Sequence, residues 1–201
     1  MEQDLSEPKE AIDREAQIIA TAANLFATKG FEATSIRDIA EGVGISKPTI
    51  YHYFADKNAL YIRIIVTGAK NLCLFTEARI SGKSAPKEQL LAFLEGHAGY
   101  FEENQVSYLA ANFGFAGLRD QLGRRQTIQW RDRHEANLRR IIEAGIRSGD
   151  FAMVRPQVAS LAILSSLQGL ARWYRSDGAL KPIEIAHELS ALFLNGVLAR
   201  R

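Results

Sequence analysis

Residues 35–54 hold the side chains whose types and spacing best suit chemistry. Lys47 can bind a phosphate or a guanine edge, while the Pro48 ring and the Thr49 methyl group can touch the methyl group of a thymine. Further polar side chains that suit contacts with DNA lie in this stretch or beside it: Ser35, Arg37, Ser46, Tyr51, His52, Tyr53 and Lys57. This set predicts binding to the phosphates and base edges of double-stranded DNA.

Two short helices would position these side chains. Ser35, or Thr34 before it, can cap a first helix that the Gly-Val-Gly of residues 42–44 would end. Ser46 can cap a second helix, from about residue 47 to residue 54. The apolar residues that would fix the angle between the helices are Ile36, Ile39, Ala40, Val43, Ile45 and Ile50. This plan suits a helix-turn-helix, but a packing helix rich in aromatic residues would show the same spacing.

The residues around these helices resemble a known family. Residues 22–40, AANLFATKGFEATSIRDIA, followed by residues 42–54, GVGISKPTIYHYF, look like the DNA-binding head of the TetR family. Residues 56–60, DKNAL, resemble the start of the family's fourth helix, where Lys57 would contact a backbone phosphate. The resemblance covers residues 13–61, with Pro48 at a position where the family usually has Gly or Ala and also accommodates Pro.

The resemblance implies a homodimeric transcriptional regulator that acts as a repressor. Its two heads would bind a palindromic DNA operator in successive major grooves. A small-molecule effector would bind in the helical body and favour a shape whose heads are wrongly spaced for the operator. The sequence of that operator stays open.

The rest of the chain is expected to be helical, because apolar residues recur at three- and four-residue spacing and no stretch alternates long enough for a strand. The expected further helices cover residues 13–30, from just after 58 to about 80, 86–103, 106–121, 124–148, 156–177 and 182–199. The predicted fold class is all-α, with about nine helices. Residues 1–12 would form an acidic tail, residues 13–58 a helix-turn-helix DNA-binding domain, and residues 59–201 a ligand-binding and dimerisation domain.

The last two expected helices are long and apolar enough to pack against their copies in a four-helix bundle, as the resemblance implies. The predicted dimer contacts are Leu161, Leu164, Gln168, Leu189 and Phe193. Val158, Ser165, Ala171, Ile185, Leu192 and Leu198 continue the same two stripes. Ordinary packing in the core of one chain predicts the same pattern.

Residues 169–186 are similar to the C-terminal pattern of TetR-type regulators of fatty-acid, aromatic-acid and sterol breakdown, several of which respond to acyl-CoA thioesters. An acyl-CoA, or a related lipid or aromatic acid, is therefore the expected effector. It needs an apolar channel for the chain and cations for the phosphates, which Arg172 and Arg175 could supply. The candidate ligand contacts are His97, Tyr100, Phe101, Phe113, Trp130, His134, Arg172 and Trp173. In the alternative, the aromatic rings pack the core or the dimer and the arginines are solvated or paired with acids.

Other functional classes find less support. The pair Glu184 and His187 has the spacing of di-iron helix bundles, but such bundles need that pair twice. Neither Cys73 nor His97 lies in a catalytic signature, and no glycine-rich phosphate loop is present. We therefore expect no enzyme, no metal and no cofactor. An interaction module that no longer binds DNA stays an alternative, because residues 14–60 hold five basic and five acidic groups.

Composition predicts a cytoplasmic protein with no membrane partner. The 201 residues are 47% hydrophobic and 24% charged, which suits one or two globular domains. No uninterrupted apolar run approaches the roughly 18 residues of a membrane span, and the N-terminus is acidic, unlike a secretory signal. The single cysteine agrees with a reducing compartment.

Overall fold

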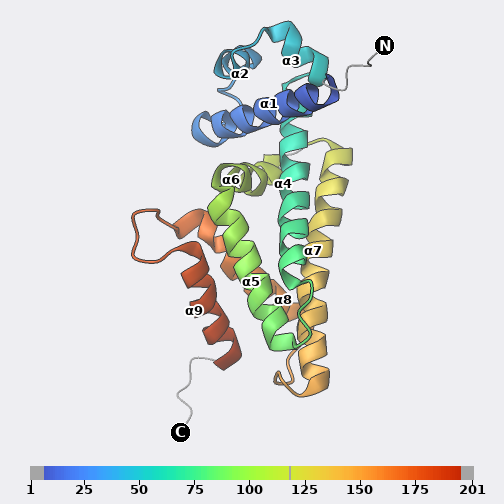
Figure 1. Ribbon diagram of the computed structural model, residues 1–201, viewed down its shortest axis with the longest axis vertical. Helices are drawn as coiled ribbons and strands as arrows, with labels where there is room; N and C mark the ends of the chain where they lie inside the picture. Colours follow the sequence, from blue (N-terminus) through green and yellow to red (C-terminus); the bar gives the residue numbers. More distant parts are fainter. Residues whose placement is uncertain (1–6, 118, 196–201) are drawn as a thin grey trace, which may run out of the picture.

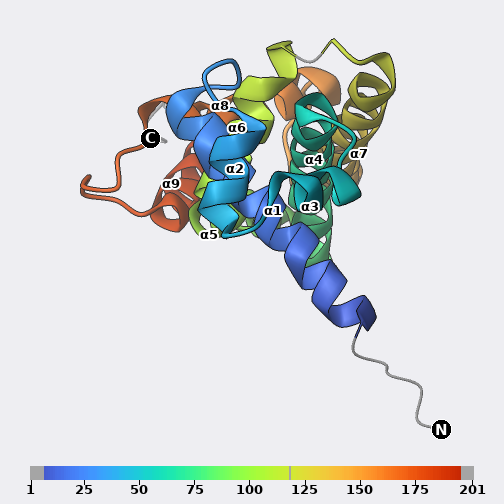
Figure 2. The same ribbon diagram turned by 90° about the horizontal axis from the view of Figure 1, so that it is seen from above.

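The computed structural model describes residues 7–117 and 119–195, and every regular element in these ranges is helical, as the all-α prediction requires. The elements are α1 (Glu7–Lys29), α2 (Ile36–Val43), α3 (Lys47–Tyr53), α4 (Lys57–Ile80), α5 (Pro86–Glu103), α6 (Gln105–Gly114), the 3-10 helix η1 (Phe115–Gly117), α7 (Gln121–Ser148), α8 (Pro156–Trp173) and α9 (Pro182–Asn195). Helices α1–α3 form a head at one end of the molecule, and α4–α9 form the body below it (Figure 1). Seen from above the head, α1 crosses the end of the molecule, with α2 and α3 beside it (Figure 2).

Two helix boundaries near the head differ from the expected ones. Helix α1 begins at Glu7 rather than near Asp13, so part of the expected tail is helical. Helix α6 ends at Gly114, whereas the expected helix continued to about residue 121. Of the other predictions, residues 1–6 of the tail and the end of the last helix, including Leu198, lie outside the described residues.

Helix α8 also ends earlier than expected, at Trp173 rather than near residue 177. The next residue, Tyr174, leaves the helix and packs edge-on against Phe101, with ring centroids 5.4 Å apart. This contact joins residues far apart in the sequence, so helical periodicity could not predict it.

The head folds through strong local signals. Ser35 forms a capping box with Asp38 at the start of α2, and Gly44 ends that helix in the left-handed conformation, with φ of 75°. Ser46 then caps α3, accepting a hydrogen bond from the backbone N–H of Thr49. The predicted core of this unit is confirmed, with Ile39, Ala40 and Ile50 buried and Ile36, Val43 and Ile45 packed against them.

Helix α4 joins the head to the body. Its first turns contribute Leu60 and Ile64 to the head core, and its later turns bury Cys73 and Thr76 in the body. The domain boundary expected at residues 58 and 59 therefore falls in the first turn of a continuous helix. By length and composition, α4 alone among the described helices is apolar enough to cross a membrane, a test that a core helix of a soluble protein also passes.

Helix α6 is a part of the body that lies next to the head, and Figure 1 shows it beneath α1. Ala110 of α6 belongs to the head core. The Tyr61 hydroxyl of α4 donates a hydrogen bond to the Gly114 carbonyl oxygen at the end of α6, at 3.1 Å. At Gly68, an added Cβ would lie 2.6 Å from the Ala111 Cβ, so this glycine permits the close packing of α4 on α6. Both units thus share α6 as a packing surface.

Candidate functional site

Helix α3 lies at the end of the molecule farthest from the body (Figure 1). Several of its polar side chains are exposed to solvent. Lys47, Pro48, Tyr51 and His52 are exposed, and the Tyr51 side chain keeps 52% of its surface accessible. Ile50 on the opposite side is fully buried and anchors the helix to the head core. The arrangement leaves one face of α3 available to the major groove of DNA.

The N-termini of α2 and α3 bring further predicted contacts to this end. Ser35 and Ser46 are exposed caps, and both hydroxyls are engaged, Ser35 with Asp38 and Ser46 with the Thr49 hydroxyl at 2.8 Å. Arg37 is exposed and its Nε donates to Glu41 at 2.6 Å. Thr49 and Tyr53 are both half-buried. Among the residues described, Lys47 has no carboxylate within ion-pair distance, so its ammonium group is free to bind a phosphate.

Lys57 has a second role that the sequence did not reveal. Its Nζ donates to the carbonyl oxygens of Phe31 and Thr34, each at 2.8 Å, and lies 4.3 Å from the centre of the Phe31 ring. The side chain thereby fastens the start of α4 to the segment between α1 and α2. An ammonium group has three N–H donors, so one stays available for the phosphate contact that is still a prediction.

The body contains a small cavity of about 60 Å³ between α4, α6, α7 and α8, here called the inner cavity. Its polar lining comes from Tyr108, Asn112, Arg131, His134 and Gln168. Its apolar lining comes from Leu72, Ala111 and Leu164, with Gly68 and Ala69 of α4. An apolar pocket with a few converging polar groups has the character of a small-molecule site.

Behind the inner cavity, three buried groups form a hydrogen-bonded chain. The Tyr108 hydroxyl lies 2.9 Å from His97 Nε2, and His97 Nδ1 lies 3.1 Å from His134 Nε2. Burial lowers the pKa of His97 well below its usual value and lowers that of His134 to about 4, so both rings are neutral near pH 7. His134 stacks on Phe93, and its Nδ1 is a buried atom with no hydrogen-bond partner among the described residues.

A second hollow, here called the outer cleft, adjoins the inner cavity. It has a volume of about 230 Å³ and shares Asn112 and Gln168 with the inner cavity. Arg172 and the exposed Phe113 also line it. The outer cleft therefore places a cation beside an aromatic ring at the edge of the inner cavity.

The structure does not bring the eight predicted ligand contacts together. His134 lines the inner cavity, His97 lies behind it, and Phe113 and Arg172 line the outer cleft. The other four lie elsewhere: Tyr100 and Phe101 are buried in the body core, Trp130 packs near Lys70 and Arg133, and Trp173 is 53% exposed in a groove with Leu192 of α9.

The candidate ligand contacts expected from the sequence included neither Arg131 nor Tyr108, although both line the inner cavity. Arg131 lies one turn before His134 on α7, so their spacing of three residues puts both on one face of the helix. That spacing could have identified Arg131 from the sequence, but only if the face of α7 that meets the cavity were already known.

Helices α8 and α9 expose apolar side chains along one side of the body. Val158, Leu161, Trp173 and Leu192 keep between 43% and 61% of their surface accessible, and Gln168 is exposed among them. The expected dimer contact at Leu164 does not agree with the structure. Leu164 is only 6% exposed and packs into the core of its own chain. Leu189 and Phe193 are half-buried against that core.

The pairs considered for catalysis are not assembled in the structure. His187 Nε2 lies 2.7 Å from Glu95 of α5, while Glu184 accepts a hydrogen bond from the backbone N–H of Lys181. The Cys73 Sγ lies 3.6 Å from a carboxylate oxygen of Glu77. Burial and this carboxylate raise the pKa of Cys73 to about 12, which keeps the thiol protonated and unreactive.

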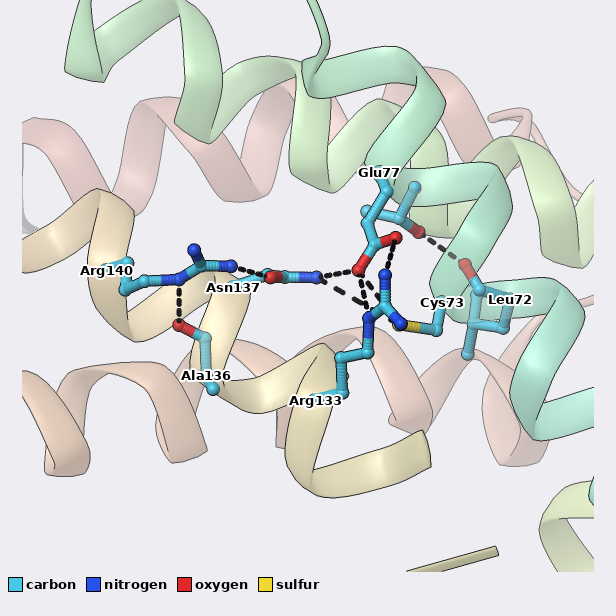
Figure 3. A network of polar contacts seen from close by, with 8 residues as sticks. Leu72, Cys73, Glu77, Arg133, Ala136, Asn137 and Arg140 are labelled. Carbon is cyan, nitrogen blue, oxygen red and sulfur yellow. Dashed lines mark hydrogen bonds and ion pairs between the residues drawn. The ribbon is translucent and has the colours of Figure 1, made fainter. Parts of the chain in front are cut away.

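Glu77 joins α4 to α7 through the polar network in Figure 3. Arg133 donates two hydrogen bonds to its carboxylate, each at 2.7 Å, and the Asn137 amide donates a third at 2.7 Å. Arg140 donates in turn to the Asn137 side chain. These bonds lower the pKa of Glu77, so the carboxylate is ionised and the network is satisfied as a structural clamp.

Comparison with known proteins finds a matching family model for each of the two parts of the chain. Residues 18–64 match the family model for bacterial regulatory proteins of the tetR family, and residues 83–197 match the model for the tetracyclin repressor-like C-terminal domain. The transcriptional repressor KstR2 of Mycobacterium tuberculosis is 26% identical over 199 residues, with 92% of each chain covered.

Solved structures agree with these matches. The TetR family transcriptional regulator PfmR from Thermus thermophilus superposes with a TM-score of 0.85 at 38% identity, over 90% of this chain and 99% of that one. AibR, solved in complex with isovaleryl coenzyme A and operator DNA, shares the fold with a TM-score of 0.82 at 22% identity, over 90% of this chain and 98% of that one. The chain therefore belongs to the tetR family of bacterial regulatory proteins.

Proposed function

We propose that this regulator represses transcription as a homodimer that binds a palindromic operator and leaves it when a small molecule enters the body. The observation that carries this proposal is the exposed polar face of α3, held by the caps at Ser35 and Ser46 on a buried core. Lys47 and Tyr51 would make the central DNA contacts, with Arg37 and Lys57 at the flanking phosphates. The protein acts by binding alone and works in the cytoplasm.

Pairing of two chains would use the exposed strip on α8 and α9. Leu161 and Gln168 lie on the solvent side of α8, and Leu192 lies on that of α9. A strip of apolar side chains that would otherwise face water favours association with a second copy. Residues 59–201 would then fix the distance between the two heads.

Helix α6 would carry the signal from the inner cavity to the head. Tyr108 and Ala111 of this helix line the inner cavity, while Ala110 packs in the head core. A ligand that widens the inner cavity must move at least one of its walls, because the cavity of about 60 Å³ is too small for a metabolite. A shift of α6 would tilt the head and lower the population of dimers able to reach both half-sites.

The effector class we propose is an acyl-CoA or a related acid. The acyl group would enter the inner cavity, and phosphates of the CoA part would lie near Arg172 in the outer cleft. AibR, which shares the fold, binds isovaleryl coenzyme A in its solved structure, which supports this choice. Arg175 is less suited than Arg172, since its guanidinium group is bonded to Asp177 at 3.1 Å and it does not line the outer cleft.

Fluorescence anisotropy on labelled DNA from directly upstream of the protein's own gene tests the proposal. We expect saturable binding that exceeds binding to scrambled DNA and weakens steeply with salt, because each neutralised phosphate releases counterions. A mixture of short, long and aromatic acyl-CoAs should release the DNA. An interaction module without operator binding predicts no preference for any genomic DNA, which a genome-wide binding selection with the same protein would reveal.

A further inference from the structure

We infer that Arg131 and Tyr108 form a recess for a carboxylate group at the inner end of the effector. The inference rests on the proposed effector site and narrows its ligand to a molecule with a short apolar segment that ends in a carboxylate. Both side chains line the inner cavity and come from different helices, α7 and α6.

Arg131 is a partly buried cation without a counter-ion. Within the described parts of the chain, no carboxylate lies within ion-pair distance of it, whereas Arg133 and Arg139 on the same helix pair with Glu77 and Glu135. The central carbon of the guanidinium group lies 4.1 Å from the centre of the Phe115 ring instead. The group also donates one hydrogen bond of 3.4 Å to the Ala111 carbonyl oxygen. Most of its five N–H donors therefore stay free for a ligand anion.

Burial gives this free charge a preference for an anion over a neutral group. Burial lowers the pKa of Arg131, because removal from water penalises the charged guanidinium group. A carboxylate in the inner cavity would compensate for this penalty and would accept two donors in one plane.

Tyr108 can supply a second donor because of the two histidines behind it. With both rings neutral, the chain Tyr108–His97–His134 holds three protons but only two hydrogen bonds. The third proton lies either on His134 Nδ1, where it has no acceptor, or on the Tyr108 hydroxyl, which lines the inner cavity. A carboxylate would select the second arrangement, because the hydroxyl proton then gains an acceptor.

The size of the inner cavity fits this assignment. A volume of about 60 Å³ has room for a few water-sized groups, so a carboxylate group can enter it. The aliphatic walls formed by Leu72 and Leu164 would contact the carbon atoms next to the carboxylate. The rest of the ligand would extend past Gln168 into the outer cleft.

Such a carboxylate has two possible sources. A free acid would bring its only charged group to Arg131. An acyl-CoA would do so when the far end of its acyl chain carries a second carboxylate, with the CoA part near Arg172. The recess is the same in both cases, so the probes must separate them.

The test measures binding by calorimetry for butyrate, hexanoate and benzoate against butyramide, hexanamide and benzamide, and for succinyl-CoA against butyryl-CoA. We expect the carboxylate member of at least one pair to bind more tightly. Arg131→Gln should weaken that binding about 10- to 100-fold, as expected when a hydrogen bond to a charged group is lost. Tyr108→Phe should weaken it as well. Preference for a free acid identifies the first source, and preference for succinyl-CoA identifies the second.

Arg124→Gln is the matched control, because Arg124 also stacks on Phe115, at 4.8 Å, but does not line the inner cavity. Equal affinity of Arg131→Gln and Arg124→Gln for the acids, equal binding of acids and amides, or no binding of any carboxylate at millimolar concentration would overturn the inference. Operator binding is measured on the same samples. If the unaltered protein did not bind an operator, the proposed repressor function would be refuted. The calorimetry would still test the carboxylate recess.

Discussion

The Tyr61 hydroxyl donates a hydrogen bond of 3.1 Å to the Gly114 carbonyl oxygen and so ties the helix that enters the head to the end of the helix that borders the inner cavity. Space for this contact depends on Gly114, since a Cβ there would lie 2.8 Å from the Tyr61 hydroxyl oxygen. The Tyr61 ring also packs on Phe31, with centroids 4.4 Å apart, within the head. One side chain thus contacts both the head and α6.

Tyr61→Phe should weaken the coupling between effector and operator. The ring keeps its packing, but the Gly114 carbonyl loses its donor, at an expected cost of about 1 kcal/mol in unfolding free energy. Operator affinity without effector should change little, while more effector should be needed for release. Anisotropy titrations with the effector measure this shift. Tyr174→Phe is the control, because the Tyr174 hydroxyl forms no hydrogen bond with the described residues. An equal shift in both variants would contradict the role of Tyr61.

Lys47→Ala combined with Tyr51→Ala should abolish specific operator binding. Both side chains are exposed on α3, so their loss removes DNA contacts from both heads without disturbing the core. We expect operator affinity to fall about 100-fold or more, with a shallower salt dependence. The dimer and its melting temperature should stay nearly unchanged. Lys83→Ala, an exposed lysine outside the head, controls for charge. Tight and salt-sensitive operator binding by the double variant would disprove the assignment.

Lys57→Met should destabilise the head. The methionine keeps the stem of the side chain but removes the donors to the Phe31 and Thr34 carbonyl oxygens, at a cost of about 1–3 kcal/mol. Urea unfolding measures this cost. The salt dependence of operator binding separates the two roles, because a lost phosphate contact in each head would lower the slope of log K against log salt by about two. Unchanged stability would contradict the structural role.

Acid should destabilise the body through the buried histidines. The pKa of His134 is about 4 in the folded chain, where burial outweighs the opposing effect of Glu77, and about 6.5 in the unfolded chain. Protons therefore bind the unfolded state first. The stability is complete above about pH 6.5 and falls toward pH 4, by at most about 1.4 kcal/mol per pH unit for each histidine.

Urea unfolding between pH 7 and pH 5 measures this effect. His134→Gln should reduce the dependence of the unfolding free energy on pH. Identical pH profiles for the unaltered protein and His134→Gln would show that His134 is already protonated or accessible in the folded state.

Leu161→Glu should separate the dimer. Leu161 is 51% exposed in the single chain, so the substitution leaves the chain's own core intact and places a charge in the proposed interface. Sedimentation should show monomers, and operator affinity should fall because a single head makes half of the contacts. Leu122→Glu, at a position on α7 that is 66% exposed, is the control. A stable dimer of Leu161→Glu would place the interface elsewhere.

The head was largely predictable because short-range signals determine it. Ser35, Gly44 and Ser46 each act within a few residues, so their types alone place both ends of α2 and the start of α3. Ile50 is the apolar residue at the centre of α3, so the sequence also indicates which face of this helix is buried. Resemblance to the family then distinguished a DNA-binding helix from a packing helix.

The body was less predictable because long-range packing decides which face of each helix is covered. Leu164 and Leu161 lie on the same apolar helix, yet Leu164 faces the core and Leu161 faces solvent. Trp173 was predicted to bind ligand but lies on the surface beside α9, whereas Arg131 lines the inner cavity. No local pattern in the sequence separates these cases.

The exposed strip on α8 and α9 affects how strongly repression depends on the amount of protein that the cell makes. When chains pair only weakly, the amount of pairs rises with the square of the amount of chain, so a modest change in synthesis alters promoter occupancy more than proportionally. A substitution at Leu161 that merely weakens pairing would therefore raise the expression threshold for silencing, without any change in the DNA sequence that the protein reads.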